Sequence, residues 1–581
     1  MVFSILKKDP DASITLREIE KRDGILLLEV EMTFAEQKIP EQVVVGWSVP
    51  CIDVYSIWRP HCSPARNIGP DWSMRSSSSR LASGAPFYSL ISYASENRMT
   101  IAVSDAQTPL EIATGICEET SEIACEVRFF TKPINRITSY CATVYIDTRT
   151  LRYEDALKEA DSFLANDCGY PSAYIPDAAK RPMYSCWYSF HQNINVDAIV
   201  EQCKLAKEYG MEAVIVDDGW QTDDSQRGYA YCGDWEVCPS KVADMKEFVD
   251  LVHACGLKFI LWYSVPFVGI HSKAYSRFSD MFLDGTKEVS EMDWARLDPR
   301  YPEVRRYLAD IYVRAKREWG IDGFKLDFID FFKLYPQTKT FDERWDVLSL
   351  EDGVDRLLSD VTKALREIDP DVLIEFRQSY FGPAIRKYGN MIRITDCPND
   401  PLANHISISD LKFVLDHTPI HSDMLMWNPD DTPDSVAHQI ICVLFSVPQI
   451  SILLDQIPES HRKVLRFWLS YWNENRDILL DGDFFADTPE HLYTQVRSVK
   501  NGKIIAAAHG NPMLTIDQEG KIDFINNMGG DTLLICANKT IGEKRYRILN
   551  CMGDEIESGK HDLTVGCHSF KVPQCGILQL F

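Results

Sequence analysis

Between residues 183 and 455 short apolar segments alternate with longer amphipathic ones, and this rhythm limits the fold more than any other feature. The short segments, such as KFILWYSV, are rich in β-branched and aromatic residues, as buried strands are. The longer ones, such as NVDAIVEQCKLAKEYG, place apolar residues on one face of a helix. The strand candidates are 183–190, 212–219, 258–265, 323–330, 371–378, 391–398, 424–430 and 449–455.

Eight such strands, with helical segments in most of the gaps between them, predict a (β/α)8 barrel over residues 179–483. The structural alternative is a doubly wound open sheet. That fold normally carries a glycine-rich phosphate-binding turn after its first strand, and this sequence has none there.

The flanking regions read differently from the barrel. Residues 1–178 contain short β segments separated by turns, which predict an antiparallel β-sandwich. Within them, residues 58–83 are rich in Ser, Pro and Arg and predict a long ordered loop, of the kind that is usually functional or mobile. Residues 484–581 return to β segments and predict a small antiparallel domain. The expected fold class is therefore multidomain α/β.

Net charge and hydropathy limit the classes of molecule that the protein is expected to bind. The formal net charge of -25 argues against nucleic acid or an anionic membrane surface as a partner. No apolar run approaches the roughly 18 residues needed for a transmembrane helix, and MVFSILKKDPDAS lacks the apolar core of a signal peptide. A small neutral or cationic ligand is the expected partner.

The 17 cysteines are scattered, with no CxxC pair and no Cys/His spacing typical of a zinc site. Free thiols in a reducing cytoplasm explain such a pattern. We therefore expect a cytoplasmic protein without a metal or another cofactor. The sequence does not decide whether the chain forms a homo-oligomer.

The chemistry of a barrel gathers where its strands end. Carboxylates and indoles meeting at one mouth are typical of a sugar site, because aromatic faces pack on the ring while charged groups bind its hydroxyls. The residues at or near these strand ends are Trp187, Asp217, Asp218, Trp220, Trp262, Lys325, Asp327, Asp330, Glu375, Arg377, Arg393, Asp396 and Trp427.

Two carboxylates can cleave a glycosidic bond, one as nucleophile and the other as proton donor. Asp327 is the expected nucleophile, because Lys325 lies two residues earlier on the same strand face and helps to keep it ionised. Asp396, on a nearby strand, is the expected acid. It needs a raised pKa for that role, and Arg393 acts in the opposite direction.

Several segments of the barrel resemble glycoside hydrolase family 36, which holds α-galactosidases, α-N-acetylgalactosaminidases and the plant raffinose and stachyose synthases. They are DDGW at 217–220, GDWEVCPSKVADMK at 233–246, GLKFILW at 256–262 and the KxD of GFKLDFID. RITDCPNDPLANHISIS resembles the segment that carries the acid/base of the family. The resemblance covers the whole barrel, and the flanking β regions match the architecture of the family less specifically.

The resemblance implies a retaining mechanism with Asp327 as nucleophile and Asp396 as acid/base. It implies that Asp217 and Asp218 hold O4 and O6 of galactose and that Lys325 reaches O3 or O4. Trp187, Trp220 and Trp262 are expected to line the sugar pocket, with a place in the barrel core as the alternative for each indole. Trp58 and Arg66 are expected either to reach over the mouth or to pack between domains.

One segment departs from the family. Its microbial α-galactosidases carry a Cys- and Gly-rich stretch after strand five, near C2 of the sugar, whereas this chain has EFRQSYFGP. Arg377 in this segment either contacts a polar or acidic group of the substrate or forms a salt bridge with Glu375 or Asp396.

The expected function is a retaining exo-α-galactosidase that acts on small oligosaccharides by double displacement. The alternatives within the family are an α-N-acetylgalactosaminidase or other modified-galactose glycosidase, and a raffinose-synthase-type transglycosylase. An inactive carbohydrate-binding barrel is the alternative from another class of protein.

Overall fold

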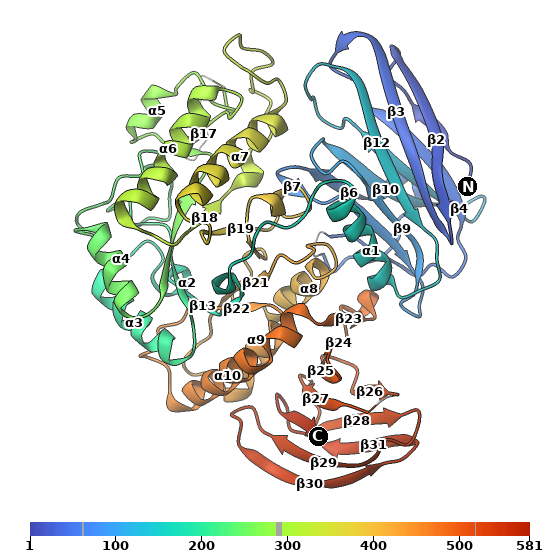
Figure 1. Cartoon of the computed structure of the whole chain (residues 1–581), viewed down its shortest axis with the longest axis vertical. Helices are drawn as coiled ribbons and strands as arrows, with labels where there is room; N and C mark the ends of the chain where they lie inside the picture. The colour runs from blue at the N-terminus through green and yellow to red at the C-terminus, as the bar shows by residue number, and fades with distance from the viewer. Residues whose placement is uncertain (61–62, 286–292, 518) are drawn as a thin grey trace.

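The computed structural model describes residues 1–60, 63–285, 293–517 and 519–581, and its centre is a closed barrel of eight parallel strands (Figure 1). Each of the eight expected strands overlaps an observed one, so the predicted fold class is confirmed, although residues 187–190 of the first expected strand form a short helix instead. The strands follow one another around the barrel in chain order: β13 (Met183–Ser185), β14 (Ala213–Val216), β15 (Lys258–Ser264), β18 (Gly323–Asp327), β19 (Leu373–Arg377), β20 (Met391–Arg393), β21 (Ile420–Leu425) and β22 (Val447–Ile450).

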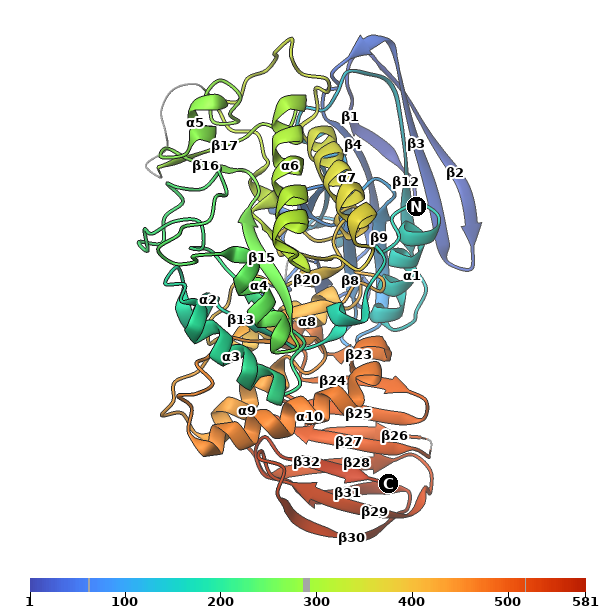
Figure 2. The same cartoon turned by 60° about the vertical axis from the view of Figure 1, so that its left-hand side comes forward.

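Helices surround the barrel, and their first turns show why they begin where they do. The side chain of Asn195 accepts a hydrogen bond from the backbone of Ala198, and Asp244 does the same for Glu247. The long helices α6 and α7 pack side by side on one flank (Figure 2). The helices are α2 (Trp187–Phe190), α3 (Val196–Glu208), α4 (Met245–Ala254), α5 (Lys273–Arg277), α6 (Pro302–Trp319), α7 (Leu350–Ile368), α8 (Pro401–Leu411), α9 (Pro433–Cys442) and α10 (Glu459–Asp481).

The N-terminal region forms two six-stranded sheets that enclose a common hydrophobic core. Strand β3 (Ile25–Lys38) shows the alternation of buried and outward residues that predicts such a sandwich. The helix α1 (Tyr153–Asn166) follows the last sandwich strand, β12 (Ile137–Asp147), and was not predicted. It buries Tyr153, Leu157 and Leu164, so an amphipathic helical pattern is present in the sequence within the region predicted to be β.

The stretch from 58 to 83 is not simply a loop. It contains a short 3-10 helix (Asp71–Ser73) and the strand β6 (Arg75–Arg80), which pairs with β10 (Leu110–Cys117). A run of four serines is a turn signal in the sequence, but pairing with β10 overrides it. The chain then turns into β7 (Ser83–Gly84), and the β6–β7 hairpin lies between the sandwich and the barrel (Figure 1).

The C-terminal region holds a seven-stranded and a three-stranded sheet beyond α10 (Figure 1). The expected purely antiparallel arrangement is corrected in two places. β25 (Lys503–Ala508) pairs parallel with β27 (Lys521–Asn526), and β26 (Met513–Ile516) pairs parallel with β28 (Thr532–Ala537). This happens because β26 leaves one sheet for the other between β25 and β27. The domain boundaries at 178 and 484 stay a prediction.

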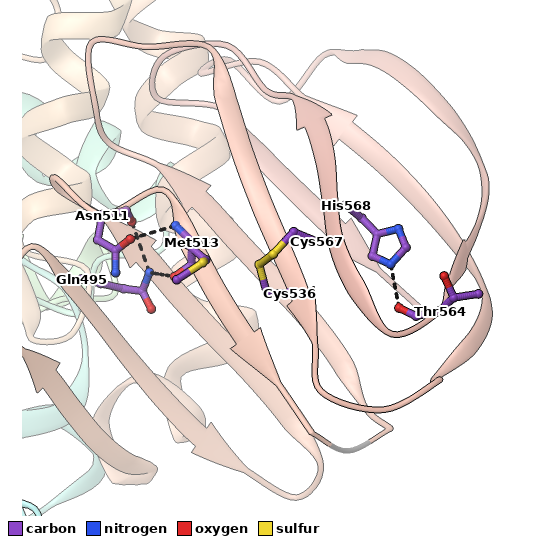
Figure 3. The surroundings of a disulfide bond; sticks show 7 residues. All are labelled: Gln495, Asn511, Met513, Cys536, Thr564, Cys567 and His568. Carbon is purple, nitrogen blue, oxygen red and sulfur yellow. Dashed lines mark hydrogen bonds between the residues drawn. A yellow bond between two sulfur atoms is a disulfide. The ribbon is translucent and has the colours of Figure 1, made fainter.

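A disulfide joins Cys536 on β28 to Cys567 on β31 (Gly566–Lys571) in the three-stranded sheet (Figure 3). It contradicts the expectation that all cysteines are free. The two residues are directly opposite in the antiparallel pairing of β28 with β31, with their Cα atoms 4.0 Å apart. Their separation of 31 residues in the sequence gives no sign of this register.

Candidate active site

Asp327 is the last residue of β18 and lies buried at the mouth of the barrel. Its Oδ1 accepts hydrogen bonds from Arg377 Nε at 2.5 Å, the Phe328 backbone at 2.7 Å and Tyr380 Oη at 3.0 Å. Its Oδ2 accepts one bond, from Trp262 Nε1 at 3.1 Å. The two carboxylate oxygens are therefore held unequally.

Asp327 is surrounded by positive charge. Burial by itself raises the pKa of its carboxyl, but Arg377, Lys325 and Arg393 together outweigh that effect and hold the pKa well below its usual value. Asp327 is therefore an ionised carboxylate, as a nucleophile must be.

Lys325 and the two aspartates after β14 meet in the same region. Lys325 Nζ donates to Asp217 Oδ2 at 2.6 Å, and both side chains are buried. Asp218 accepts from Gln192 Nε2 at 2.6 Å and Gln221 Nε2 at 2.7 Å. Burial nevertheless raises the pKa of Asp218 to about 7. The structure thus pairs Lys325 of β18 with Asp217 across the intervening strand β15, and Asp218 follows Asp217 in the chain.

Asp396 lies just beyond β20, and about half of its side chain is exposed. Its Oδ1 accepts from Arg393 Nη2 at 2.8 Å. Burial by itself raises the pKa of Asp396, but the positive charges of Arg393, Arg377 and Lys325 lower it by more. The pKa of Asp396 is therefore below its usual value. The raised pKa that an acid role requires is thus absent while Arg393 is bound to Asp396.

Arg393 connects Asp396 to a deeper carboxylate that the sequence did not indicate. Arg393 Nη1 donates to Asp423 Oδ1 at 2.7 Å, and Tyr188 Oη donates to Asp423 Oδ2 at 2.9 Å. Asp423 lies in β21, which begins at Ile420 rather than at 424, so the expected strand excluded it. Glu375 also lies near Arg393, with its Oε1 3.9 Å from Arg393 Nε.

The indoles divide into two groups. Trp262 bonds Asp327, and its ring lies 6.2 Å from that of Tyr229, centroid to centroid, in a stacked arrangement. Trp187 begins α2 and is partly exposed, with its ring against His191. The position of Trp187 is compatible with a sugar pocket, whereas Trp262 is only 2% exposed and meets the site through its hydrogen bond to Asp327. Tyr229 comes from the segment between β14 and α4, which was not expected to contribute.

Trp220 is fully buried in the barrel core and does not line the mouth. Its Nε1 donates to the Trp262 carbonyl at 3.0 Å, and its ring packs against Trp235, Tyr263 and Trp319. Trp220 therefore takes the alternative role expected for each indole, a place in the barrel core, because its ring has no exposed face and its N–H is already bonded. We therefore remove Trp220 from the proposed sugar-binding residues.

Trp58 and Arg66 also lie away from the mouth. Trp58 is buried against Phe413, and Arg66 Nη2 donates to Asp410 at 2.9 Å. Asp410 is in the last turn of α8, and the carboxyl end of a barrel helix lies on the side where the strands begin. Both residues therefore serve domain packing.

The β6–β7 hairpin supplies the contact with the mouth instead. Arg80 donates to the carbonyls of Asp330 at 3.0 Å and Phe332 at 2.6 Å, just after β18. The Gly84 backbone donates to the Ser379 carbonyl at 3.0 Å, just after β19. The N-terminal region thus binds the two loops that flank Asp327.

Neither a metal site nor a membrane span is found in the described part of the chain. No group of three or more His, Cys, Asp or Glu residues in residues 1–60, 63–285, 293–517 and 519–581 is arranged to hold a metal ion. Over the same residues, no helix has both the length and the apolar character to cross a bilayer.

This fold and site define a multidomain (β/α)8-barrel protein with charged side chains gathered at the barrel mouth. Residues 175–369 match the family model described as melibiase. This match covers about a third of the chain, and in sequence and fold the chain resembles the α-galactosidases of glycoside hydrolase family 36.

Curated relatives match the chain over part of its length. The α-galactosidase Mel36A of Lactobacillus acidophilus is 28% identical over 158 residues, which is 26% of this chain and 20% of that protein. A protein of Flavonifractor plautii named A type blood α-D-galactosamine galactosaminidase is 25% identical over 27% of this chain and 15% of its own length. The matches thus span a fifth or less of these two relatives.

Solved structures match over almost the whole chain. The galactosidase domain of AgaSK gives a TM-score of 0.67 at 13% identity and covers 98% of this chain and 80% of that one. The α-galactosidase AgaA of Geobacillus stearothermophilus gives a TM-score of 0.65 at 13% identity, with 98% and 81% covered. At this identity, these matches show the shared fold.

Proposed function

We propose that the protein is a retaining exo-α-galactosidase that hydrolyses terminal α-galactosyl residues of small oligosaccharides. One observation carries the proposal. Asp327 is a buried, ionised carboxylate at a strand end, and one of its two oxygens has a single hydrogen-bond donor. A carboxylate held in this way is suited to attack an anomeric carbon.

In the first step, Asp327 attacks C1 of the sugar. The bond from C1 to the aglycone oxygen breaks, and Asp396 gives that oxygen a proton. In the second step, a water molecule attacks C1 and gives its proton to Asp396, and the bond between C1 and Asp327 breaks. Two inversions return the original stereochemistry.

Asp396 must be protonated for the first step, and its contact with Arg393 opposes this. Arg393 also binds Asp423, so it has a second carboxylate partner when it releases Asp396. Its charge is then balanced at Asp423, and Asp396 has half of its side chain exposed to reach a leaving group. We propose that substrate binding brings about this exchange.

The sugar hydroxyls are proposed to bind Asp217, Asp218 and Lys325, which form one buried polar cluster. Trp187 would face the ring, and Trp262 would hold Asp327 through its indole N–H. Retaining glycoside hydrolysis by two carboxylates requires neither a metal nor an organic cofactor.

The first experiment compares initial rates on aryl α-galactoside, aryl α-N-acetylgalactosaminide, aryl α-galactosaminide and aryl α-glucoside. We expect turnover of the α-galactoside to exceed the others, and failure on all four would reject the hydrolase proposal. Added sucrose tests for a transglycosylase, because a new trisaccharide would form at the expense of free galactose. The galactosaminidase relative makes the two amino-sugar substrates necessary.

The second experiment tests the nucleophile. Asp327→Ala is expected to abolish turnover, and azide should then restore cleavage of an activated α-galactoside and give the β-galactosyl azide. Asp250→Ala, on the exposed face of α4, is the matched control and should keep full activity. Near-normal activity of Asp327→Ala would overturn the assignment.

A cytoplasmic location also stays a proposal. Fourteen free cysteines in the described residues support it, while the Cys536–Cys567 disulfide is of a kind that persists in oxidising compartments. Alkylation of free thiols in intact cells, followed by mass spectrometry of the two cysteine peptides, tests it.

A further inference from the structure

Arg377 contacts a different carboxylate from the two expected from the sequence. Arg377 Nε lies 2.5 Å from Asp327 Oδ1, whereas the sequence pointed to Glu375 or Asp396. Glu375 instead accepts from Gln449 Nε2 at 2.5 Å, and Asp396 accepts from Arg393. Arg377 therefore acts directly on the proposed nucleophile.

The guanidinium of Arg377 is fixed rather than free to reach toward solvent. Arg377 Nη1 donates to the Gln378 carbonyl at 2.9 Å, and the side chain is only 12% exposed. The guanidinium carbon lies 5.1 Å from the centroid of the Phe328 ring and 5.7 Å from that of Tyr380. These contacts fix the direction from which the charge meets Asp327.

Arg377 and Tyr380 both donate to Oδ1, and so does the Phe328 backbone. Three donors use the lone pairs of Oδ1, while Oδ2 has one donor, from Trp262. Oδ2 is therefore the oxygen that keeps a lone pair for bond formation.

We propose that Arg377 is a positioning residue that anchors Oδ1 of Asp327, presents Oδ2 to the anomeric carbon, and speeds release of the sugar while opposing its attachment. The inference rests on the proposed function, because it assigns a role within the two-step reaction.

The difference between the steps follows from charge. When Oδ2 bonds to C1, Asp327 becomes a neutral ester and its ion pair with Arg377 is lost. When water attacks C1 and the C1–Oδ2 bond breaks, the bonding electrons return to the carboxylate and the ion pair forms again. Arg377 thus opposes the first step and favours the second, because it stabilises the carboxylate that leaves.

Kinetics on an aryl α-galactoside with a good leaving group separate the two steps. In Arg377→Ala we expect kcat, which is then limited by the second step, to fall by about 10- to 100-fold, the size of one lost charge-assisted hydrogen bond. The first step, measured by kcat/KM, should change by less than about threefold. KM should fall with kcat, and a burst of aryl product should appear.

Two variants are matched controls. Arg377→Lys keeps the charge and should recover part of kcat, whereas Tyr380→Phe removes a neutral donor from the same oxygen and should produce a smaller burst. Free guanidine added to Arg377→Ala should also raise kcat. Equal loss of kcat and kcat/KM without a burst would show that Arg377 acts on the first step or on the amount of folded enzyme, and would overturn the proposal.

A second readout does not require turnover. Several charged or polar groups face Asp327, and all except Arg377 are kept in the variant: Lys325 on β18, Arg393 on β20, Trp262 on β15, Tyr380, Asp330 and Asp396. The carboxyl of Asp327, identified by comparison with Asp327→Asn in carbon-13 spectra, should titrate at a higher pH in Arg377→Ala than in the wild type.

The two experiments fail in different ways. If the wild-type protein turns over no glycoside, the proposed function falls, and the titration still decides whether Arg377 sets the charge of Asp327. If the wild type is active but Asp327 titrates at the same pH in Arg377→Ala, the role of Arg377 falls and the proposed function stands.

Discussion

The ion pair between Lys325 and Asp217 gives the sharpest test of how the candidate site is held together. Lys325 Nζ and Asp217 Oδ2 are 2.6 Å apart, and the two side chains are 5% and 3% exposed. Lys325→Met removes the charge but keeps much of the volume, and it leaves Asp217 buried without its cation. Removing one partner of a buried pair costs about 3–5 kcal/mol.

The double variant separates pairing from packing. Replacing both residues, as Lys325→Met with Asp217→Asn, removes both charges together, so no uncompensated ion stays buried. We expect the double variant to be more stable than the sum of the two single effects predicts, by about 2–3 kcal/mol.

Urea unfolding followed by tryptophan fluorescence, on the wild type and the three variants, gives the four free energies of the cycle. A loss below about 1 kcal/mol in Lys325→Met would refute the reasoning, because the threshold lies well under the buried-pair range. Strict additivity in the double variant would refute it as well. Each variant should also lose galactoside turnover, since both residues are proposed to bind the sugar.

Three further predictions concern other parts of the molecule. Burial raises the pKa of Asp218 to about 7, so above pH ~4 the folded state keeps a proton that the unfolded state has lost. The free energy of unfolding should therefore fall as pH rises from about 4 to 7, by at most about 1.4 kcal/mol per pH unit. Asp218→Asn should flatten this slope in urea titrations, and an unchanged slope would contradict the prediction. The two cysteines of the disulfide are 31 residues apart in the sequence. From the lost loop-closure entropy, Cys536→Ala with Cys567→Ala should lower the free energy of unfolding of the C-terminal sheets by about 3–4 kcal/mol and leave turnover unaffected. Equal thermal stability with and without reductant would argue against the disulfide. Arg80→Ala leaves the carbonyls of Asp330 and Phe332 without this donor, so hydrogen exchange should quicken in the loop after β18, whereas exchange equal to that of the wild type would show that the hairpin does not hold it.

Much of the barrel was predictable because its strands are continuous apolar runs that end abruptly in polar residues. Lys325, Asp327, Asp217 and Asp218 all lie at such ends, and the structure brings them to one mouth. Here the position along a strand determines the position in the fold, since all parallel strands end on the same side.

Other parts of the site follow from contacts that no local pattern encodes. Asp423 was missed because β21 carries three buried polar residues in a row, His421, Ser422 and Asp423, so the strand does not resemble an apolar run. Trp220 follows the end of β14, where the chain leaves the strand geometry and side-chain direction no longer alternates. The ion pair of Arg377 with Asp327 depends on the side-chain rotamers of both residues and on the distance between β18 and β19, and neither can be derived from the sequence.

The contact of the β6–β7 hairpin with the mouth has a consequence for the order of assembly during synthesis. Arg80 binds carbonyls 250 and 252 residues later in the chain. Domains generally fold as units with the N-terminal one first, so the sandwich can be complete before the ribosome has made β18 and β19. Those strands then emerge beside a docking surface that already exists, and the sandwich serves as an internal template for the loops that frame Asp327.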